Sequence, residues 1–127
     1  MWASISPSTG RGPEGLAVMK MLQAIIRPEK LDEVMKALEL KGFVALTVTD
    51  VRGRGEQKGI SLQFRGRKMD VDLLPKVKIE MVLDDVEIDS ALRTIRESAR
   101  TGSIGDGKIF VLNVDLMAKV RTEEIWR

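Results

Sequence analysis

The chain has 127 residues and a mass of 14.2 kDa, which is the size of one compact domain with a single core. Its net charge is only +2, and it contains no cysteine, histidine or tyrosine, which excludes disulfides, histidine-based triads and cysteine or histidine metal sites. Three phenylalanines and two tryptophans are too few for a base-stacking platform. No apolar run approaches the roughly 20 residues that span a bilayer.

The N-terminal stretch, residues 1–18, is rich in Ser, Pro and Gly and shows no hydrophobic periodicity. It lacks the long apolar centre of a secretory signal and the arginine-rich amphipathic pattern of a transit peptide. We expect residues 1–18 to be a disordered extension or a leader, and residues 19–127 to form a single folded domain.

The first predicted elements are a strand, a helix and a second strand. The apolar run 21–27 predicts a mostly buried strand. Pro28 suits the first position of a helix, and apolar residues follow at helical spacing up to Leu38. Gly42 favours the end of this helix. Residues 43–51 are rich in β-branched side chains and predict the second strand.

Residues 52–72 are polar, basic and interrupted by glycines, so we expect a long loop without regular structure, of a length that is usually functional or mobile. The alternating run 77–83 predicts a third strand paired with the second. Four acids in residues 84–89 favour the start of a second helix, an explanation that we prefer to a metal site. Residues 108–114 predict a fourth strand, and residues 116–121 an extra edge strand.

The predicted order, β-α-β-β-α-β, is typical of the α+β ferredoxin-like fold. In this fold a four-stranded antiparallel sheet carries two helices on one face, and here a long loop joins strands two and three. Alternate residues on the other face are partly apolar. The uncovered face therefore indicates self-association.

Two glycine-rich segments, residues 53–59 and 101–108, are candidates for anion binding, because glycines let backbone N–H groups approach an anion closely. Residues 102–108 match the G-x-x-x-x-G-K part of a P-loop. However, Ile109 stands where magnesium binding needs Ser or Thr, and the loop runs from helix to strand. A backbone nest beside Lys108 remains one interpretation, and a plain connection with helix-stopping glycines is the other.

Two other functions of this fold fit the sequence poorly. An RNA-recognition module needs a glycine–aromatic pattern, and only Phe110 lies on the fourth predicted strand. Acylphosphatase-like chemistry needs a phosphate cradle beside an Asn. Arg27 and Asn113 are present, but no cradle motif joins them.

Five motifs in this order, without gaps between residues 19 and 124, resemble the PII nitrogen-regulatory signal proteins. The motifs are AIIRPEKL (24–31), TVTDV (47–51), GEQKG (55–59), DLLPKVK (72–78) and ARTGSIGDGKIFV (99–111). The chain looks most like the branch that regulates ammonium channels, including its archaeal members.

The resemblance implies a homotrimer with three ATP or ADP sites in the clefts between subunits, and no catalysis. ATP with Mg²⁺ would allow 2-oxoglutarate to bind, and the long loop 55–73 would then change shape. Through this loop the protein would act on an ammonium transporter or a nitrogen-assimilation enzyme. The resemblance therefore implies a cytoplasmic protein that meets the membrane only through a partner and binds no nucleic acid.

The resemblance also assigns ligand positions. The nucleotide-binding positions are Ile25, Thr47, Gly53, Arg54, Gly55, Gln57, Glu80, Val82, Gly105, Asp106, Gly107, Lys108, Lys119 and Arg121. The positions around 2-oxoglutarate are Arg27, Gln57, Lys58, Gly59 and Lys76. The partner-binding positions are Phe64, Arg65 and Gly66. Gln57 matches the family's Mg²⁺ ligand, and Arg121 matches an arginine that reaches the nucleotide phosphates from the neighbouring subunit. Arg65 matches an arginine at the loop tip that can plug a channel.

Several residues depart from the family pattern. Met69 stands where the family carries a nucleotidylated tyrosine, so that modification is excluded. Glu56 and Lys119 stand where arginines are common near the phosphates, and the like charge of Glu56 would weaken ATP binding or change the preference for ADP. Two alternatives therefore stay open: a PII-like trimer with a changed ligand, and a ferredoxin-like binding module whose glycines are only turns.

Overall fold

The computed structural model describes residues 18–55, 60–64, 67–71 and 73–127. Residues 1–18 were predicted to form an extension, and of these only Val18 lies within the described ranges. Val18 itself is tied to the fold, because its carbonyl accepts a hydrogen bond from the Asp85 amide at 2.8 Å. Within the described ranges, no helix is both long and apolar enough to cross a membrane.

The described residues form eight strands and two α-helices, and one short 3-10 turn at Pro28–Lys30 leads into the first helix. In chain order they are β1 (Met19–Ile26), α1 (Leu31–Leu40), β2 (Thr47–Gly53), β3 (Ile60–Phe64), β4 (Arg67–Val71), β5 (Leu74–Asp84), α2 (Asp85–Ala99), β6 (Gly107–Asn113), β7 (Met117–Ala118) and β8 (Ile125–Trp126).

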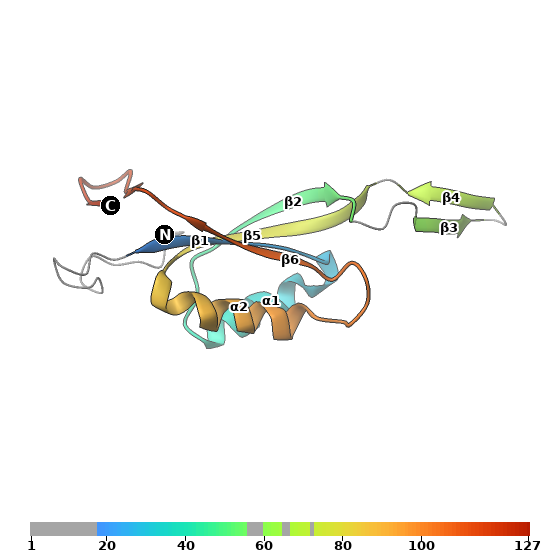
Figure 1. The fold of residues 1–127 in the computed structure, drawn as a ribbon, viewed down its shortest axis with the longest axis horizontal. Coiled ribbons are helices and arrows are strands. Elements are labelled where there is room, and N and C mark those ends of the chain that lie inside the picture. The colour runs from blue at the N-terminus through green and yellow to red at the C-terminus, as the bar shows by residue number, and fades with distance from the viewer. Residues whose placement is uncertain (1–17, 56–59, 65–66, 72) are drawn as a thin grey trace.

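The main sheet has the strand order β2-β5-β1-β6, with every neighbouring pair antiparallel. Both helices cover the same face of this sheet (Figure 1). This arrangement is the ferredoxin-like α+β fold, which confirms the predicted fold class and the predicted pairing between β2 and the strand that follows the long segment. The structure starts β2 at Thr47, whereas the sequence predicted residue 43, because Phe43 turns into the core instead.

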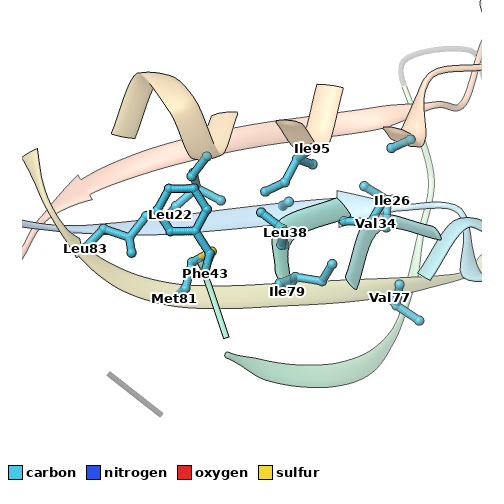
Figure 2. Close-up of a cluster of buried hydrophobic side chains, with 13 residues drawn as sticks. Leu22, Ile26, Val34, Leu38, Phe43, Val77, Ile79, Met81, Leu83 and Ile95 are labelled. Atoms are coloured by element: carbon cyan, nitrogen blue, oxygen red, sulfur yellow. The ribbon is translucent and has the colours of Figure 1, made fainter. Parts of the chain in front are cut away.

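The core lies between the sheet and the two helices (Figure 2). Residues alternate along each strand, so every second side chain of β1 and β5 points toward the helices. On β1 these include Leu22 and Ile26, and on β5 Ile79 and Leu83, all no more than 2% exposed. Val34 and Leu38 of α1 and Ile95 of α2 fill the space above them, each of them fully buried.

Both helices begin where the sequence predicts, and α1 also ends where the sequence predicts. Pro28 lies in the 3-10 turn that leads into α1, and Gly42, with φ of +89°, follows its C-terminus in a left-handed conformation that favours glycine. Asp85 and Glu87 lie in the first turn of α2. Carboxylates suit this end of a helix, where the backbone dipole is positive.

A long segment does connect β2 with its partner β5, but the prediction that residues 52–72 lack regular structure is wrong for the strands at 60–64 and 67–71. β3 and β4 pair antiparallel as a two-stranded ribbon that projects beyond the ends of β2 and β5 (Figure 1). The sequence around Ile60, Leu62 and Phe64 alternates apolar and polar residues, as strands do. The basic residues and glycines on either side obscured this period.

The C-terminal residues form a second small sheet, in which β7 pairs with β8 and not with the edge of the main sheet. The prediction of an edge strand at residues 116–121 is therefore wrong, because β7 does not pair with the main sheet. Trp126 had no assigned role, yet it is only 8% exposed and packs with Met19, Val82 and Met117. Strand alternation places Met19 and Val82 on the sheet face opposite the helices.

Candidate functional site

The loop between α2 and β6 is organised around the carboxylate of Asp106. Asp106 Oδ2 accepts hydrogen bonds from the backbone amides of Thr101 and Gly102, both at 2.8 Å, and Oδ1 accepts one from the Thr101 hydroxyl. The Thr101 hydroxyl oxygen in turn accepts a bond from the Ser103 amide at 3.1 Å. These bonds, that of the Thr101 hydroxyl first, hold the pKa of Asp106 far below its usual value, so the carboxylate is charged at neutral pH.

Two cations from neighbouring strands attach to this loop. Arg27, which follows β1, donates from Nε to Asp106 Oδ1 at 3.0 Å and from Nη2 to the Ile104 carbonyl at 2.8 Å. Lys76 of β5 donates from Nζ to the Gly105 carbonyl at 2.6 Å. The resemblance had assigned Arg27 and Lys76 to the dicarboxylate, and Gly105 and Asp106 to the nucleotide. The structure brings these two sets into direct contact.

The cluster retains capacity for an anion. Arg27 carries five N–H donors and Lys76 carries three, and the contacts above use two and one of them. Burial, followed by the neighbouring charge of Arg27, lowers the pKa of Lys76 from its usual value. An anion placed between the two cations would relieve this repulsion. The arrangement therefore suits a carboxylate or phosphate ligand.

The glycines of this loop adopt conformations that side chains disfavour. Gly102, Gly105 and Gly107 have φ values of +88°, +100° and +114°. A Cβ on Gly107 would lie 1.8 Å from the carbonyl oxygen of Ile25, so the close passage of the loop over β1 requires glycine. In contrast, a Cβ on Gly53 would meet no atom within 4 Å, and φ is not positive there.

Lys108 is the second residue of β6 and lies opposite Ile25 of β1. A pocket of about 400 Å³ adjoins it, between β6 and the C-terminal part of α2. Asp106, Gly107 and Lys108 contribute to its wall, with Ile95 and Phe110 among the apolar lining. Among the residues predicted for the nucleotide, those of the α2–β6 loop thus lie beside a hollow of small-ligand size.

The sheet face opposite the helices carries the residues predicted for the base and ribose. Thr47 on β2 lies directly opposite Glu80 on β5. Glu80 accepts a hydrogen bond from Gln23 Nε2 at 2.9 Å and forms an ion pair with Lys78 at 3.8 Å. The sequence reasoning missed Gln23 and Lys78, although both lie at alternate positions that place them on this face.

Val82, also predicted near the base and ribose, is 2% exposed and packs in the cluster that includes Trp126. Its side chain therefore offers almost no surface to a ligand in this protomer. No local sequence pattern indicates this cover, because Trp126 lies 44 positions further along the chain.

Lys119 and Arg121 lie at the other end of the sheet from the α2–β6 loop. The loop meets β1 at Ile26, whereas the C-terminal turn packs near Met19, at the opposite end of that strand. Eight strand residues separate these ends by about 23 Å at roughly 3.3 Å per residue. Figure 1 shows the loop and the C-terminus at opposite ends of the main sheet. One protomer therefore does not bring these two parts of the predicted nucleotide site together.

Lys119 is engaged within its own chain. Its Nζ lies 3.5 Å from Glu124 Oε1 and 5.3 Å from the centre of a Trp126 ring, which fits an ion pair together with a cation–π contact. Arg121 is exposed.

Several predicted residues lie outside the described ranges. These are Gln57, Lys58 and Gly59, predicted for Mg²⁺ and 2-oxoglutarate, and Arg65 and Gly66, predicted for the partner. Phe64 is the last residue of β3, and Gly53, Arg54 and Gly55 lie where β2 leads into the ribbon segment.

Comparison with known proteins connects this geometry to one family. Residues 19–124 match the family model described as nitrogen regulatory protein P-II. The chain is 56% identical over 106 residues to nitrogen regulatory protein P-II 2 of Methanothermobacter thermautotrophicus, covering 84% of this chain and 92% of that protein. It is 51% identical over 106 residues to the P-II protein of Mesorhizobium japonicum, covering 84% and 95% of the two chains.

A solved structure agrees with these sequence matches. The crystal structure of Arabidopsis thaliana PII bound to citrate is similar with a TM-score of 0.69 and 40% sequence identity, over 86% of this chain and 89% of that chain. The resemblance seen in the five sequence motifs is thereby confirmed. The chain belongs to the P-II family of nitrogen regulatory proteins.

Proposed function

We propose that this protein is a trimeric, non-enzymatic sensor that binds ATP or ADP together with 2-oxoglutarate and acts through residues 55–73 on a protein partner. The observation that carries the proposal is the contact between the α2–β6 loop and the two cations Arg27 and Lys76. This contact supports the proposal, because the loop proposed for the phosphates and the two cations proposed for the dicarboxylate are in direct hydrogen-bond contact.

The nucleotide phosphates are proposed to lie against the turn that Gly105 and Gly107 make possible, with Lys108 as the neighbouring cation. Backbone amides of a glycine turn and a lysine charge together suit phosphate oxygens. Thr47 and Glu80, which face each other across two strands, supply hydrogen-bonding groups for the base and ribose.

The trimer is proposed because one protomer cannot complete this site. Arg121 and the α2–β6 loop lie at opposite ends of the sheet, so a second copy must supply the arginine to a nucleotide held by the loop. Phe110 and Leu112, 47% and 44% exposed, lie on the sheet face opposite the helices, where another protomer would cover them.

The dicarboxylate is proposed to bind Arg27 and Lys76, with Gln57, Lys58 and Gly59 completing the site and Gln57 ligating Mg²⁺ held by the nucleotide phosphates. The citrate-bound PII structure supports a carboxylate ligand, because citrate belongs to the same chemical class. We propose an ammonium transporter or a nitrogen-assimilation enzyme as the partner, contacted through Phe64, Arg65 and Gly66. The protein would then act in the cytoplasm and reach the membrane only through that partner.

A related trimer with a changed nucleotide preference is the second candidate. Two observations favour it. Lys119, expected near the phosphates, is bound to Glu124 and Trp126 of its own chain, and Glu56 adds a negative charge to the predicted site. Both features weaken the hold on a triphosphate, so ADP would compete better than usual with ATP.

Isothermal titration with ATP and with ADP, each with Mg²⁺ and with or without 2-oxoglutarate, tests the proposal. The proposal predicts sub-millimolar binding of at least one nucleotide, and 2-oxoglutarate heat only when ATP and Mg²⁺ are present. Sedimentation of the same sample should give the mass of a trimer. No heat with either nucleotide, or 2-oxoglutarate binding that is equally tight without ATP, would contradict it.

A further inference from the structure

The α2–β6 loop and the two cations hold each other in place. Two hydrogen bonds from Arg27 and one from Lys76 reach the loop, at distances from 2.6 to 3.0 Å. Arg27 follows β1 and Lys76 lies on β5, and these two strands are direct neighbours in the sheet. The loop is therefore tied to a rigid part of the fold at one corner.

Asp106 is the junction between the two parts. On the loop side its carboxylate accepts bonds from Thr101 and Gly102, and on the strand side it accepts the bond from Arg27 Nε. A ligand that fixes the loop therefore fixes the acceptor of Arg27. A ligand that fixes Arg27 likewise restrains Asp106, and with it the two amides that Asp106 holds.

We propose that Asp106 is a positioning residue that couples the two ligand sites, an inference that rests on the proposed function for the identity of the ligands. With a polyphosphate on the loop, Asp106 and the carbonyls of Ile104 and Gly105 hold both cations in place before the dicarboxylate arrives. The ordering of two long side chains then no longer opposes dicarboxylate binding. This route acts beside the shared Mg²⁺ ion, and it works equally in both directions.

Arg27 and Lys76 keep N–H groups for a ligand while they bind the loop. Arg27 uses only Nε and Nη2 on the loop, and Lys76 uses one of its three N–H groups. The same side chains can therefore hold the loop and a carboxylate at once.

Isothermal titration of Mg²⁺–ATP, without and with saturating 2-oxoglutarate, measures the coupling as the ratio of the two dissociation constants. Asp106→Asn keeps the side-chain size but removes the charge, and Asp115→Asn, in the exposed segment beyond the other end of β6, removes an equal charge as a control. We expect at least fivefold tightening in the wild type and in Asp115→Asn, and less than twofold in Asp106→Asn.

Two further measurements distinguish positioning from a general loss of structure. Arg27→Lys keeps the charge but cannot donate from two nitrogens at once, so it should lose the coupling in the same way, and it serves if Asp106→Asn does not fold. With nucleotide present, 2-oxoglutarate should slow hydrogen exchange at the Thr101 and Gly102 amides in the wild type but not in Asp106→Asn.

The outcomes separate the two proposals. A wild type that binds no nucleotide overturns the proposed function and this inference with it. A wild type that binds both ligands, while Asp106→Asn and Arg27→Lys retain coupling within twofold of it, overturns this inference alone. Nucleotide binding without any response to 2-oxoglutarate also overturns it.

Discussion

The two glycine-rich segments of this chain look alike in sequence but differ in what the fold asks of them. In the α2–β6 loop, Gly107 has a positive φ and passes so close to Ile25 that no side chain fits. At Gly53 and Gly55, where β2 leads into the ribbon segment, φ is not positive and a Cβ would meet no atom within 4 Å. The first segment needs glycine for its own fold, whereas in the second nothing within the described chain requires it.

Glycine content alone therefore does not identify a ligand-binding loop. The α2–β6 loop is bonded within itself through Asp106 and to the side chains of Arg27 and Lys76. These contacts reduce the freedom that the loop still has to lose when a phosphate binds. For Gly53 and Gly55 we propose an external reason, which is a ligand or a neighbouring protomer that comes close to the backbone.

The largest expected effect separates the two segments by stability. Gly107→Ala places a methyl group within 1.8 Å of a backbone oxygen and demands a strained φ, so we expect a loss of about 3 kcal/mol in unfolding free energy, measured by urea denaturation. Gly53→Ala is the matched control and should change stability by less than about 0.5 kcal/mol. Equal losses of unfolding free energy in both variants would show that the fold requires glycine no more at position 107 than at position 53.

Lys108→Ala tests the ligand-binding role of the preorganised loop. Removing a charge-assisted hydrogen bond to phosphate should weaken nucleotide binding by about 1–3 kcal/mol, with little change in the melting temperature. Titration calorimetry with ATP and ADP measures the effect. An unchanged dissociation constant would assign Lys108 a structural role only.

Gly55→Ala tests the other segment by binding. Because the added methyl group meets nothing in the chain, stability should stay within about 0.5 kcal/mol of the wild type. If the nucleotide approaches this backbone closely, its affinity should fall about tenfold, which is about 1.4 kcal/mol. Full affinity in this variant would mean that the glycine serves neither the fold nor the nucleotide.

The smallest expected effect is a pH dependence carried by Asp106. Its pKa is lowered in the folded protein, so its contribution to stability is complete above the unfolded pKa of about 4 and is lost as the pH falls below that value. Urea denaturation at pH 5 and pH 3 should show a steeper loss for the wild type than for Asp106→Asn. Because the carboxylate is partly exposed, added salt should reduce the difference. If the wild type and Asp106→Asn lose the same unfolding free energy between pH 5 and pH 3, the pH dependence does not come from Asp106.

Periodicity predicted most of the fold because burial enforces it. The alternation in β5 and the apolar face of α1 both survive in the structure, since Ile79 and Leu38 must face the same core. Periodicity failed around Leu62, where charged neighbours interrupt the pattern of a short strand. It also could not predict that Trp126, far along the chain, packs against Val82.

The candidate site was predictable only by residue type and resemblance. Lys108 is a cation beside glycines, which spacing can indicate, whereas Arg27 and Lys76 were assigned as ligand positions by the resemblance. The contact between Arg27 and Asp106 joins residues 79 positions apart and depends on how β1 and β6 pair, which no local pattern contains.

The most direct test of the account asks whether the nucleotide site is shared between protomers. Lys108→Ala and Arg121→Ala should each weaken nucleotide binding by about 1–3 kcal/mol, but coexpression of the two chains lets one protomer supply Lys108 and its neighbour Arg121. In randomly mixed trimers about a quarter of the sites then combine both intact residues. The account predicts that calorimetry recovers high-affinity binding at about a quarter of the wild-type stoichiometry, whereas no recovery in demonstrably mixed trimers would contradict it.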